Sequence, residues 1–356
     1  MSTTTTSRAL DLYRGTSRVV GQDRARRQLA VLLERQVQVS QEEWDHSESA
    51  IICGWTGTGK TYLVRMMAQL TGLPFADANA TQYTETGYAG DDLSQMFLPL
   101  LESAARCHDE RKHQGDRHPV LGGEKHRESS VLKRDDIEEI AEVAASGVLL
   151  LDEFDKWMQR INHHTGRLDV AIQAELLKMI EGSTVYVSDN EDEAGIPFDT
   201  SRVLILCAGA FVGLTQQVLR RMEQPSEYVN NEGFWTQLQQ EDFIRYGIIP
   251  ELSGRLNKLV FLRPLTKDDL AQIILQPGGP IDEWCQRFER AGCEWDVPES
   301  AVISLCEDAI QRNVGARGVD AVLWIAFHDA LFRASAHPLG GHRVSLRVNQ
   351  KTAVLD

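Results

Sequence analysis

The chain has 356 residues, enough for two domains, and its 42% apolar and 25% charged residues are the balance of an ordinary water-soluble protein. The formal charge of −15 argues against broad nucleic-acid binding, because that mode requires a basic face for the phosphate backbone. No segment has the apolar length of a membrane span, and residues 1–7 lack the features of a secretory signal, so we expect a cytoplasmic protein.

The N-terminal part of the chain reads as a tail followed by a helix. We expect residues 1–15 to be disordered, since they open with a Thr- and Ser-rich run. After Gly21 and Gln22, the apolar residues Ala25, Leu29 and Leu33 fall on one face of a predicted helix. The six cysteines of the whole chain occur singly, without a Cys-x-x-Cys pair, and are predicted to be reduced packing residues.

Residues 54–61, GWTGTGKT, have the spacing of a phosphate-binding loop. Ile51 and Ile52, in the segment 49–53 before it, indicate a short buried strand, and a helical stripe that begins at Leu63 follows it. In this motif glycines let backbone N–H groups surround phosphates, Lys60 reaches the β- and γ-phosphates, and the Thr61 hydroxyl ligates Mg²⁺. We therefore predict ATP and Mg²⁺ binding, with these contact residues in the loop: Thr56, Gly57, Thr58, Gly59, Lys60 and Thr61.

Further apolar runs predict the other strands of one sheet. They cover residues 73–78, 148–151, 203–207 and 258–261. Because the runs are continuous and alternate with helical patterns, they favour an α/β fold with a five-stranded parallel sheet. Between the first two of these runs, residues 107–136 are charged and lack apolar periodicity, which predicts a mobile insertion. Its histidines, at 108, 113, 118 and 126, do not have the spacing of a helical metal-ligand pair.

The strand at 148–151 ends in two carboxylates, Asp152 and Glu153. In a phosphate-loop ATPase this is where Mg²⁺ and the attacking water are held. Asp152 would support the metal, directly or through water, and Glu153 would orient and polarise the water. The alternative is a strand that ends by chance in solvated acids, and the upstream phosphate loop favours the functional interpretation.

A domain boundary is predicted after the last of these strands, giving a large domain over 16–263 and a small one over 264–356. Thr266 is the expected N-cap of the helix that opens the small domain. Helical patterns follow, and then the alternating residues Val344, Leu346 and Val348 predict a strand. The small domain is therefore expected to be mainly helical.

Six segments occur in the order found in the ClpX and HslU branch of AAA+ ATPases. They are GYAG at 87–90, LLDEFDK at 150–156, LLKMIEG at 176–182, GAF at 209–211, GIIPELSGRL at 247–256 and GARG at 315–318. The chain resembles this branch from residue 19 to about residue 333. The resemblance implies an AAA+ domain with a helical lid domain, ATP bound between the subunits of a hexameric ring, and a protein client.

The resemblance also implies roles for individual residues. Arg255 resembles the arginine finger that reaches the γ-phosphate of a neighbour, and Arg317 resembles the second sensor arginine. Val19 and Val20 would line the adenine pocket. Tyr88 resembles the aromatic pore residue that grips an extended polypeptide. Outside this context, each arginine would be read as a surface ion pair and Tyr88 as a turn residue.

The chain differs from ClpX in several places. ClpX begins with a zinc-binding domain that recruits substrates, and this chain begins with a polar tail, so we expect that route to be missing. Residues 214–242 contain no Ile-Gly-Phe protease-docking tripeptide, which makes a ClpP-type protease a doubtful partner. The acidic residues 189–193 replace a basic loop, and residues 207–209, CAG, offer no polar first sensor. The insertion at 107–136 lies where HslU has a longer intermediate domain.

The favoured function is that of an ATP-driven unfoldase or remodelling ATPase that moves a polypeptide client through a ring. The alternative is a nucleotide-dependent switch or assembly scaffold that recruits partners without threading. Loss of Tyr88 would abolish the first function and spare the second. Residues 209–214, GAFVGL, superficially resemble a loop of the transcription activators of the AAA+ class. We reject that function because the activator loop lies before the strand that ends in the Asp–Glu pair, whereas residues 209–214 lie after it.

Overall fold

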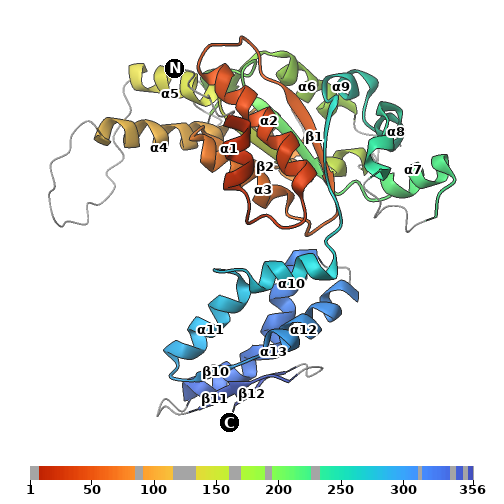
Figure 1. Cartoon of the computed structure of the whole chain (residues 1–356). Helices are drawn as coiled ribbons and strands as arrows, with labels where there is room; N and C mark the ends of the chain where they lie inside the picture. The colour runs from red at the N-terminus through yellow and green to blue at the C-terminus, as the bar shows by residue number, and fades with distance from the viewer. Residues whose placement is uncertain are drawn as a thin grey trace, which may run out of the picture. The chain divides into compact units, whose positions relative to one another are not determined.

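The computed structural model describes residues 8–84, 91–114, 134–159, 170–188, 195–225, 233–311, 315–336, 342–347 and 352–355. Contacts within the chain form two compact units (Figure 1). The larger unit consists of Met1–Gly15, Ala25–Cys53 and Thr61–Phe261. The smaller unit consists of Thr16–Arg24, Gly54–Lys60 and Leu262–Asp356.

The larger unit is built on a five-stranded parallel sheet, as the apolar runs predict. The strand order is β2 (Phe75–Asn79), β5 (Val148–Asp152), β8 (Leu204–Gly209), β1 (Ser49–Gly54) and β9 (Lys258–Leu262). All residues of β1 and β8 are buried, because helices cover both faces of a parallel sheet. The order matters for the site, since the phosphate loop follows β1 and the two carboxylates follow β5, with β8 between these strands.

Helix α2 (Asp23–Ser40) is anchored to the edge of the sheet at which the strands begin. Its buried Gln36 donates amide hydrogen bonds to the carbonyl oxygens of Ser146 and Arg202, which precede β5 and β8. A buried amide without such partners would be costly, so these bonds fix the helix against the strand starts.

Residues 8–15 correct the prediction of a disordered tail over 1–15. They form helix α1 (Arg8–Gly15), whose Leu12 is buried. The Tyr13 carbonyl accepts a hydrogen bond of 2.6 Å from Arg26, and the Arg26 guanidinium lies over the Tyr13 ring. The tail prediction is wrong here because these contacts with α2 are tertiary and leave no periodic signal in so short a segment. Residues 1–7 lie outside the described residues.

The prediction of a mobile insertion over residues 107–136 is also wrong at both ends of that range. Helix α4 (Leu98–Gln114) continues past residue 107, and helix α5 begins before residue 136 (Arg134–Ala145). Apolar residues occur mainly in the first turns of α4. The charged residues that follow can continue the helix, because extending a helix costs less free energy than starting one. Residues 115–133 lie outside the described residues.

The remaining elements of the larger unit surround the sheet. They are α3 (Lys60–Thr71), η1 (Ala80–Gln82), β3 (Tyr83–Thr84), β4 (Asp91–Asp92), η2 (Leu93–Phe97), η3 (Phe154–Gln159), α6 (Val170–Glu181), β6 (Thr184–Val187), β7 (Ile196–Asp199), α7 (Leu214–Met222), η5 (Phe234–Gln237), α8 (Gln240–Tyr246) and α9 (Pro250–Arg255). One hydrophobic core joins β1, β2, β5 and β8 to helices α4, α5, α6, α7, α8 and α9.

The smaller unit is mainly helical, as predicted. Its helices are α10 (Lys267–Leu275), α11 (Pro280–Arg290), α12 (Glu299–Gln311) and α13 (Gly315–Ala336), with a sheet of β10 (Glu294–Asp296), β11 (Arg343–Ser345) and β12 (Val354–Leu355). The Thr266 cap is confirmed, because its side chain accepts a hydrogen bond from the Asp269 N–H. Phe288 and Phe327 are fully buried at the centre of this unit.

Candidate functional site

The phosphate loop, residues 54–61, spans the end of β1 and the start of α3. Gly59 has φ of 92°, a conformation that glycine adopts without strain. A Cβ at Gly54 would lie 2.8 Å from the Leu262 carbonyl oxygen, so a larger residue would not fit there. The buried Lys60 places its Nζ 2.7 Å from the Gly54 carbonyl oxygen and 3.2 Å from that of Trp55. The Lys60 ammonium is thus held at the loop by the loop's own backbone.

A polar network, which we call the Gln22 network, fixes the loop within the smaller unit. The Gln22 amide donates to the carbonyl oxygens of Thr58 at 3.4 Å and Arg263 at 2.9 Å, and its Oε1 accepts from the Arg263 N–H at 3.1 Å. Arg263 in turn donates two hydrogen bonds to Asp269, of 2.6 and 2.9 Å. These contacts join the phosphate loop to the first helix of the smaller unit.

Asp269 is the charged end of the Gln22 network. Burial disfavours its charged form, but hydrogen bonds from Arg263 and Thr266 outweigh burial and lower the pKa of the Asp269 carboxyl. A Cβ at Gly21 would lie 2.5 Å from the Asp269 Oδ1, so the segment before α2 also approaches this carboxylate closely. The sequence did not predict this network, although it placed Gln22 and Thr266 at helix starts.

In the larger unit, Thr61 and Asp152 come together across 91 residues of sequence. The Thr61 hydroxyl donates a hydrogen bond of 2.7 Å to Asp152 Oδ2, and Asp152 Oδ1 accepts one of 2.8 Å from the Glu153 N–H. The sequence predicted both Thr61 and Asp152 as ligands of one metal ion. A hydroxyl and a carboxylate in contact are oxygen donors of the kind that Mg²⁺ prefers.

Glu153 has an unusual backbone conformation. Its φ is 58°, in the left-handed region, and its side chain is exposed. Such a conformation costs a residue other than glycine about 1–3 kcal/mol, and residues of this kind concentrate at functional sites. The carboxylate is therefore free to meet solvent, as the water-polarising role predicted for Glu153 requires.

Asp155 is a third carboxylate near the end of β5, in the segment LLDEFDK, and no role was predicted for it. It is buried and accepts hydrogen bonds from the N–H groups of Ala210 at 3.3 Å and Phe211 at 3.2 Å. Asp155 thereby joins the segment after β5 to the segment after β8. The neighbouring strand residue Cys207 is buried, and burial raises the pKa of its thiol, so this thiol is a neutral packing group.

Arg255 lies at the end of α9, and its side chain is 59% exposed. Its Nε and Nη2 both donate to Glu181 Oε1, at 3.0 and 2.7 Å. Within the described part of the chain, the hydrogen-bond partner of Arg255 is thus a surface carboxylate at the end of α6. The structure does not bring Arg255 to the carboxylates of its own β5.

The remaining predicted site residues are placed only in part. Val19 and Val20 are buried in the segment before α2, and Arg317 belongs to the first turn of α13. Tyr88 lies outside the described residues, as do the acidic residues 189–193. Their predicted roles remain predictions.

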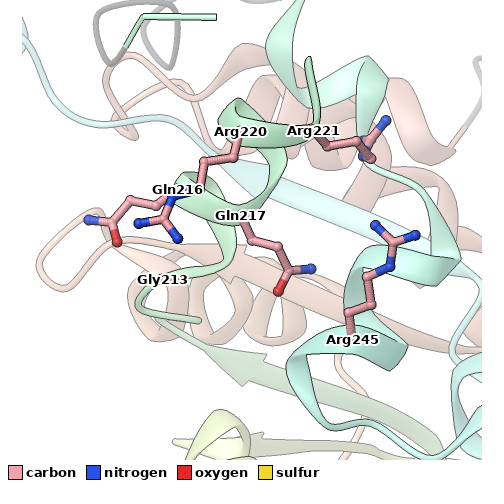
Figure 2. Close-up of a pocket in the computed structure, with 6 residues that line it drawn as sticks. All are labelled: Gly213, Gln216, Gln217, Arg220, Arg221 and Arg245. Carbon is pink, nitrogen blue, oxygen red and sulfur yellow. The ribbon is translucent and has the colours of Figure 1, made fainter. Parts of the chain in front are cut away.

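A hollow of about 510 Å³ lies elsewhere on the larger unit, at α7 and α8 (Figure 2). It is lined by Gly213, Gln216, Gln217, Arg220, Arg221 and Arg245. Arg221 is bound by the buried Asp242, at 2.8 and 2.9 Å, and Figure 2 shows Arg220 and Arg245 projecting from different sides of the hollow. Because its lining contains no residue of the phosphate loop and neither Asp152 nor Glu153, this hollow is distinct from the predicted nucleotide site.

Comparison with known proteins identifies the family. A family model described as AAA domain (Cdc48 subfamily) matches residues 45–259. The ATP-dependent Clp protease ATP-binding subunit ClpX of Treponema denticola is 28% identical, with 94% of this chain and 78% of the relative covered. Its namesake from Porphyromonas gingivalis is 29% identical, with 89% and 75% covered, and that from Bacteroides thetaiotaomicron is 27% identical, with 92% and 77% covered.

These matches agree with the fold of the larger unit, a five-stranded parallel sheet in which Asp152 ends β5 and contacts Thr61. Among the described helices, none has the length and apolar character needed to cross a membrane. The family model alone covers more than half of the residues. The chain therefore belongs to the AAA domain (Cdc48 subfamily) family, as a ClpX-like AAA+ ATPase that hydrolyses ATP.

Proposed function

We propose that this ATPase binds ATP with Mg²⁺ at the phosphate loop and uses hydrolysis to remodel a protein client. The observation that carries the proposal is the contact of 2.7 Å between the Thr61 hydroxyl and Asp152, with Glu153 next in the chain. Thr61 and Asp152 would hold the ion, directly or through water. Bound Mg²⁺ would neutralise charge on the phosphates.

Lys60 would bind the phosphates, and Glu153 would position the attacking water. Lys60 would exchange its bonds to the Gly54 and Trp55 carbonyl oxygens for bonds to phosphate oxygens, which are stronger because both partners are charged. Glu153 would accept a hydrogen bond from the attacking water and hold it in line with the γ-phosphate. Thr56, Gly57, Thr58 and Gly59 would offer backbone N–H groups, and Val19 and Val20 would contact adenine.

We also propose that the working form is a ring, hexameric by analogy with its family. Arg255 supports this, since an exposed arginine with one surface partner is available to a neighbouring copy. In the smaller unit, α13 exposes large apolar side chains opposite its buried face: Trp324 is 57% exposed and Phe332 is 76% exposed. Exposed aromatic residues on one helix face are typical of protein interfaces. Arg317 would act on nucleotide in its own subunit.

Glu153→Gln and Asp152→Asn, with Glu142→Gln as control, test the nucleotide site. Glu142 is an exposed carboxylate on α5 and has no place in the site. Glu153→Gln should bind ATP with near-normal affinity and hydrolyse it at least about a hundredfold more slowly, because the amide cannot accept the water proton. Asp152→Asn should lose the Mg²⁺ dependence of ATP binding. Equal turnover in Glu153→Gln and Glu142→Gln would refute the role of Glu153.

The client would be a protein whose chain, once extended, is gripped by Tyr88. In Tyr88→Ala, ATP hydrolysis should persist and ATP-dependent unfolding of a tagged test protein should be lost, because a large amphipathic ring is the gripping group. Tyr88→Phe is the matched control and should retain unfolding. If Tyr88→Ala remodels its client at the wild-type rate, the protein acts as a nucleotide-dependent switch or scaffold, without threading.

A further inference from the structure

Helices α4 and α5 of the larger unit pack against each other and bring a histidine and two carboxylates together. His108 projects from α4, and Asp136 and Glu139 project from α5. Residues three apart on a helix share a face, so both carboxylates lie on the same side of α5. The Nε2 or Nδ1 of the histidine and one oxygen of each carboxylate all lie within 4.8 Å of one another.

The state of His108 points to a ligand. Its side chain is 7% exposed, and its buried Nε2 makes no hydrogen bond in the part of the chain that the structure describes. Glu139 Oε2 lies 3.2 Å from that Nε2, so a carboxylate is near, but the pair lacks the geometry of a hydrogen bond. Buried polar groups are normally satisfied, and an ion between the imidazole and the carboxylates would satisfy this nitrogen.

We propose that His108, Asp136 and Glu139 form a binding site for a divalent transition-metal ion, with Zn²⁺ as the best fit. An imidazole nitrogen and carboxylate oxygens are ordinary zinc ligands, and three protein ligands leave one position of a tetrahedron for water. Mg²⁺ and Ca²⁺ prefer oxygen ligands alone, so the imidazole disfavours them.

The site would join the end of α4 to the start of α5, the two helices that flank residues 115–133 in the chain. A metal ion that binds the folded protein but not the unfolded protein would stabilise the pairing of these helices. This site is distinct from the proposed Mg²⁺ site, because none of its ligands belongs to the phosphate loop or to β5. The competing interpretation is a plain histidine–carboxylate ion pair, which would bind no metal.

The test uses the untagged full-length protein, freed of metal with a chelator and without nucleotide. Zn²⁺ is then added, bound zinc is counted by mass spectrometry after dialysis, and affinity is measured by calorimetry. The variants are Glu139→Gln and Asp136→Asn, which keep side-chain size, with Glu142→Gln as the matched control on the same helix. Asp152→Asn shows whether any bound zinc belongs to the predicted Mg²⁺ site.

We expect one Zn²⁺ per chain in the wild type, in Glu142→Gln and in Asp152→Asn. Glu139→Gln and Asp136→Asn should each bind at least about tenfold more weakly, because each loses a charged ligand. Co²⁺ in place of Zn²⁺ should give visible absorption that His108→Gln changes. Absence of bound zinc in the wild type, or affinity in Glu139→Gln equal to that in Glu142→Gln, would overturn the proposal and leave a simple ion pair.

Discussion

The phosphate loop and Arg255 are held in opposite ways. Lys60 is buried, with its ammonium bonded to two backbone carbonyl oxygens, and the Gln22 network fixes the same loop from the side. Arg255 is mostly exposed and bonded to one surface carboxylate, Glu181. A surface ion pair of this kind contributes about 0–1 kcal/mol, so Arg255 can leave it easily.

The difference separates groups proposed to act within one subunit from a group proposed to act on another. A lysine that binds phosphate gains from being positioned before the ligand arrives, since little order is lost on binding. An arginine that must reach a neighbour cannot be held by its own fold in its working position. Weak attachment to Glu181 is what the second case requires.

The largest expected effect comes from Arg255→Ala. If Arg255 completes the site of a neighbour, its loss should slow ATP hydrolysis about a thousandfold, the lower range for an arginine finger, with ATP binding nearly unchanged. Steady-state hydrolysis and binding of a fluorescent ATP analogue measure the two effects. Arg220→Ala, an exposed arginine on α7, is the control. Glu181→Gln should keep hydrolysis within about threefold, because it removes only the weak partner of Arg255.

Hydrolysis in Arg255→Ala at the rate of Arg220→Ala would contradict the comparison. Arg255 would then be only one partner of an ordinary surface ion pair with Glu181.

Lys60→Ala should have the next largest effect, on binding itself. Hydrogen bonds to charged groups contribute about 1.5–3 kcal/mol each, so the loss of two such bonds to phosphate corresponds to at least about a hundredfold in affinity. Lys178→Ala, an exposed lysine on α6, controls for the loss of one positive charge. Calorimetric titration with ATP should distinguish them. Affinities within threefold of each other would remove Lys60 from the site.

Disruption of the Gln22 network should have a smaller effect, which is on the free energy of unfolding and on its pH dependence. Asp269→Asn should reduce the free energy of unfolding near pH 7 by about 1–3 kcal/mol, because it weakens the charged bonds from Arg263. Since the folded state lowers the Asp269 pKa, this stabilisation is present above the unfolded pKa of about 3.9 and is lost as pH falls through the folded pKa.

Urea unfolding of both proteins from pH 7 to pH 3 tests this sign. The gap between wild type and Asp269→Asn should be constant down to about pH 5 and shrink below about pH 4. Asp268→Asn, on the adjacent residue, is the control and should show no such gap. A gap that widens as pH falls would mean that the Asp269 carboxylate is not stabilised by Arg263.

Sequence patterns predicted the elements whose cause is local. The apolar runs gave the five strands, because a strand covered on both faces must be apolar throughout, and the Thr266 cap was found from its own side chain and its neighbours. The glycines, Lys60 and Thr61 could be proposed as phosphate contacts because a phosphate loop is contiguous in sequence. Asp152 was predicted at the end of an apolar strand, where the structure places it next to the Thr61 hydroxyl.

What sequence could not predict depends on contacts between distant residues. Gln22 and Arg263 are 241 residues apart, and no periodicity marks their bond. Helix α1 is too short to carry a clear pattern, and the continuation of α4 rests on propagation of a helix started by apolar residues upstream. The pair of Arg255 with Glu181 joins two motifs that were each found but not connected.

The central claim, that each active site needs an arginine from another copy of the chain, is tested most directly by mixed assemblies. Arg255→Ala keeps its own Glu153, and Glu153→Gln keeps the Arg255 that it offers to a neighbour. When the two variants are co-expressed at equal amounts and assemble into mixed rings, complete sites should form at about a quarter of the interfaces. A complete site needs Arg255→Ala on one side, with a chance of one half, and Glu153→Gln on the other, with a chance of one half. ATP turnover of the mixture should then far exceed that of either variant alone. Turnover no higher than the mean of the two parents would contradict the account.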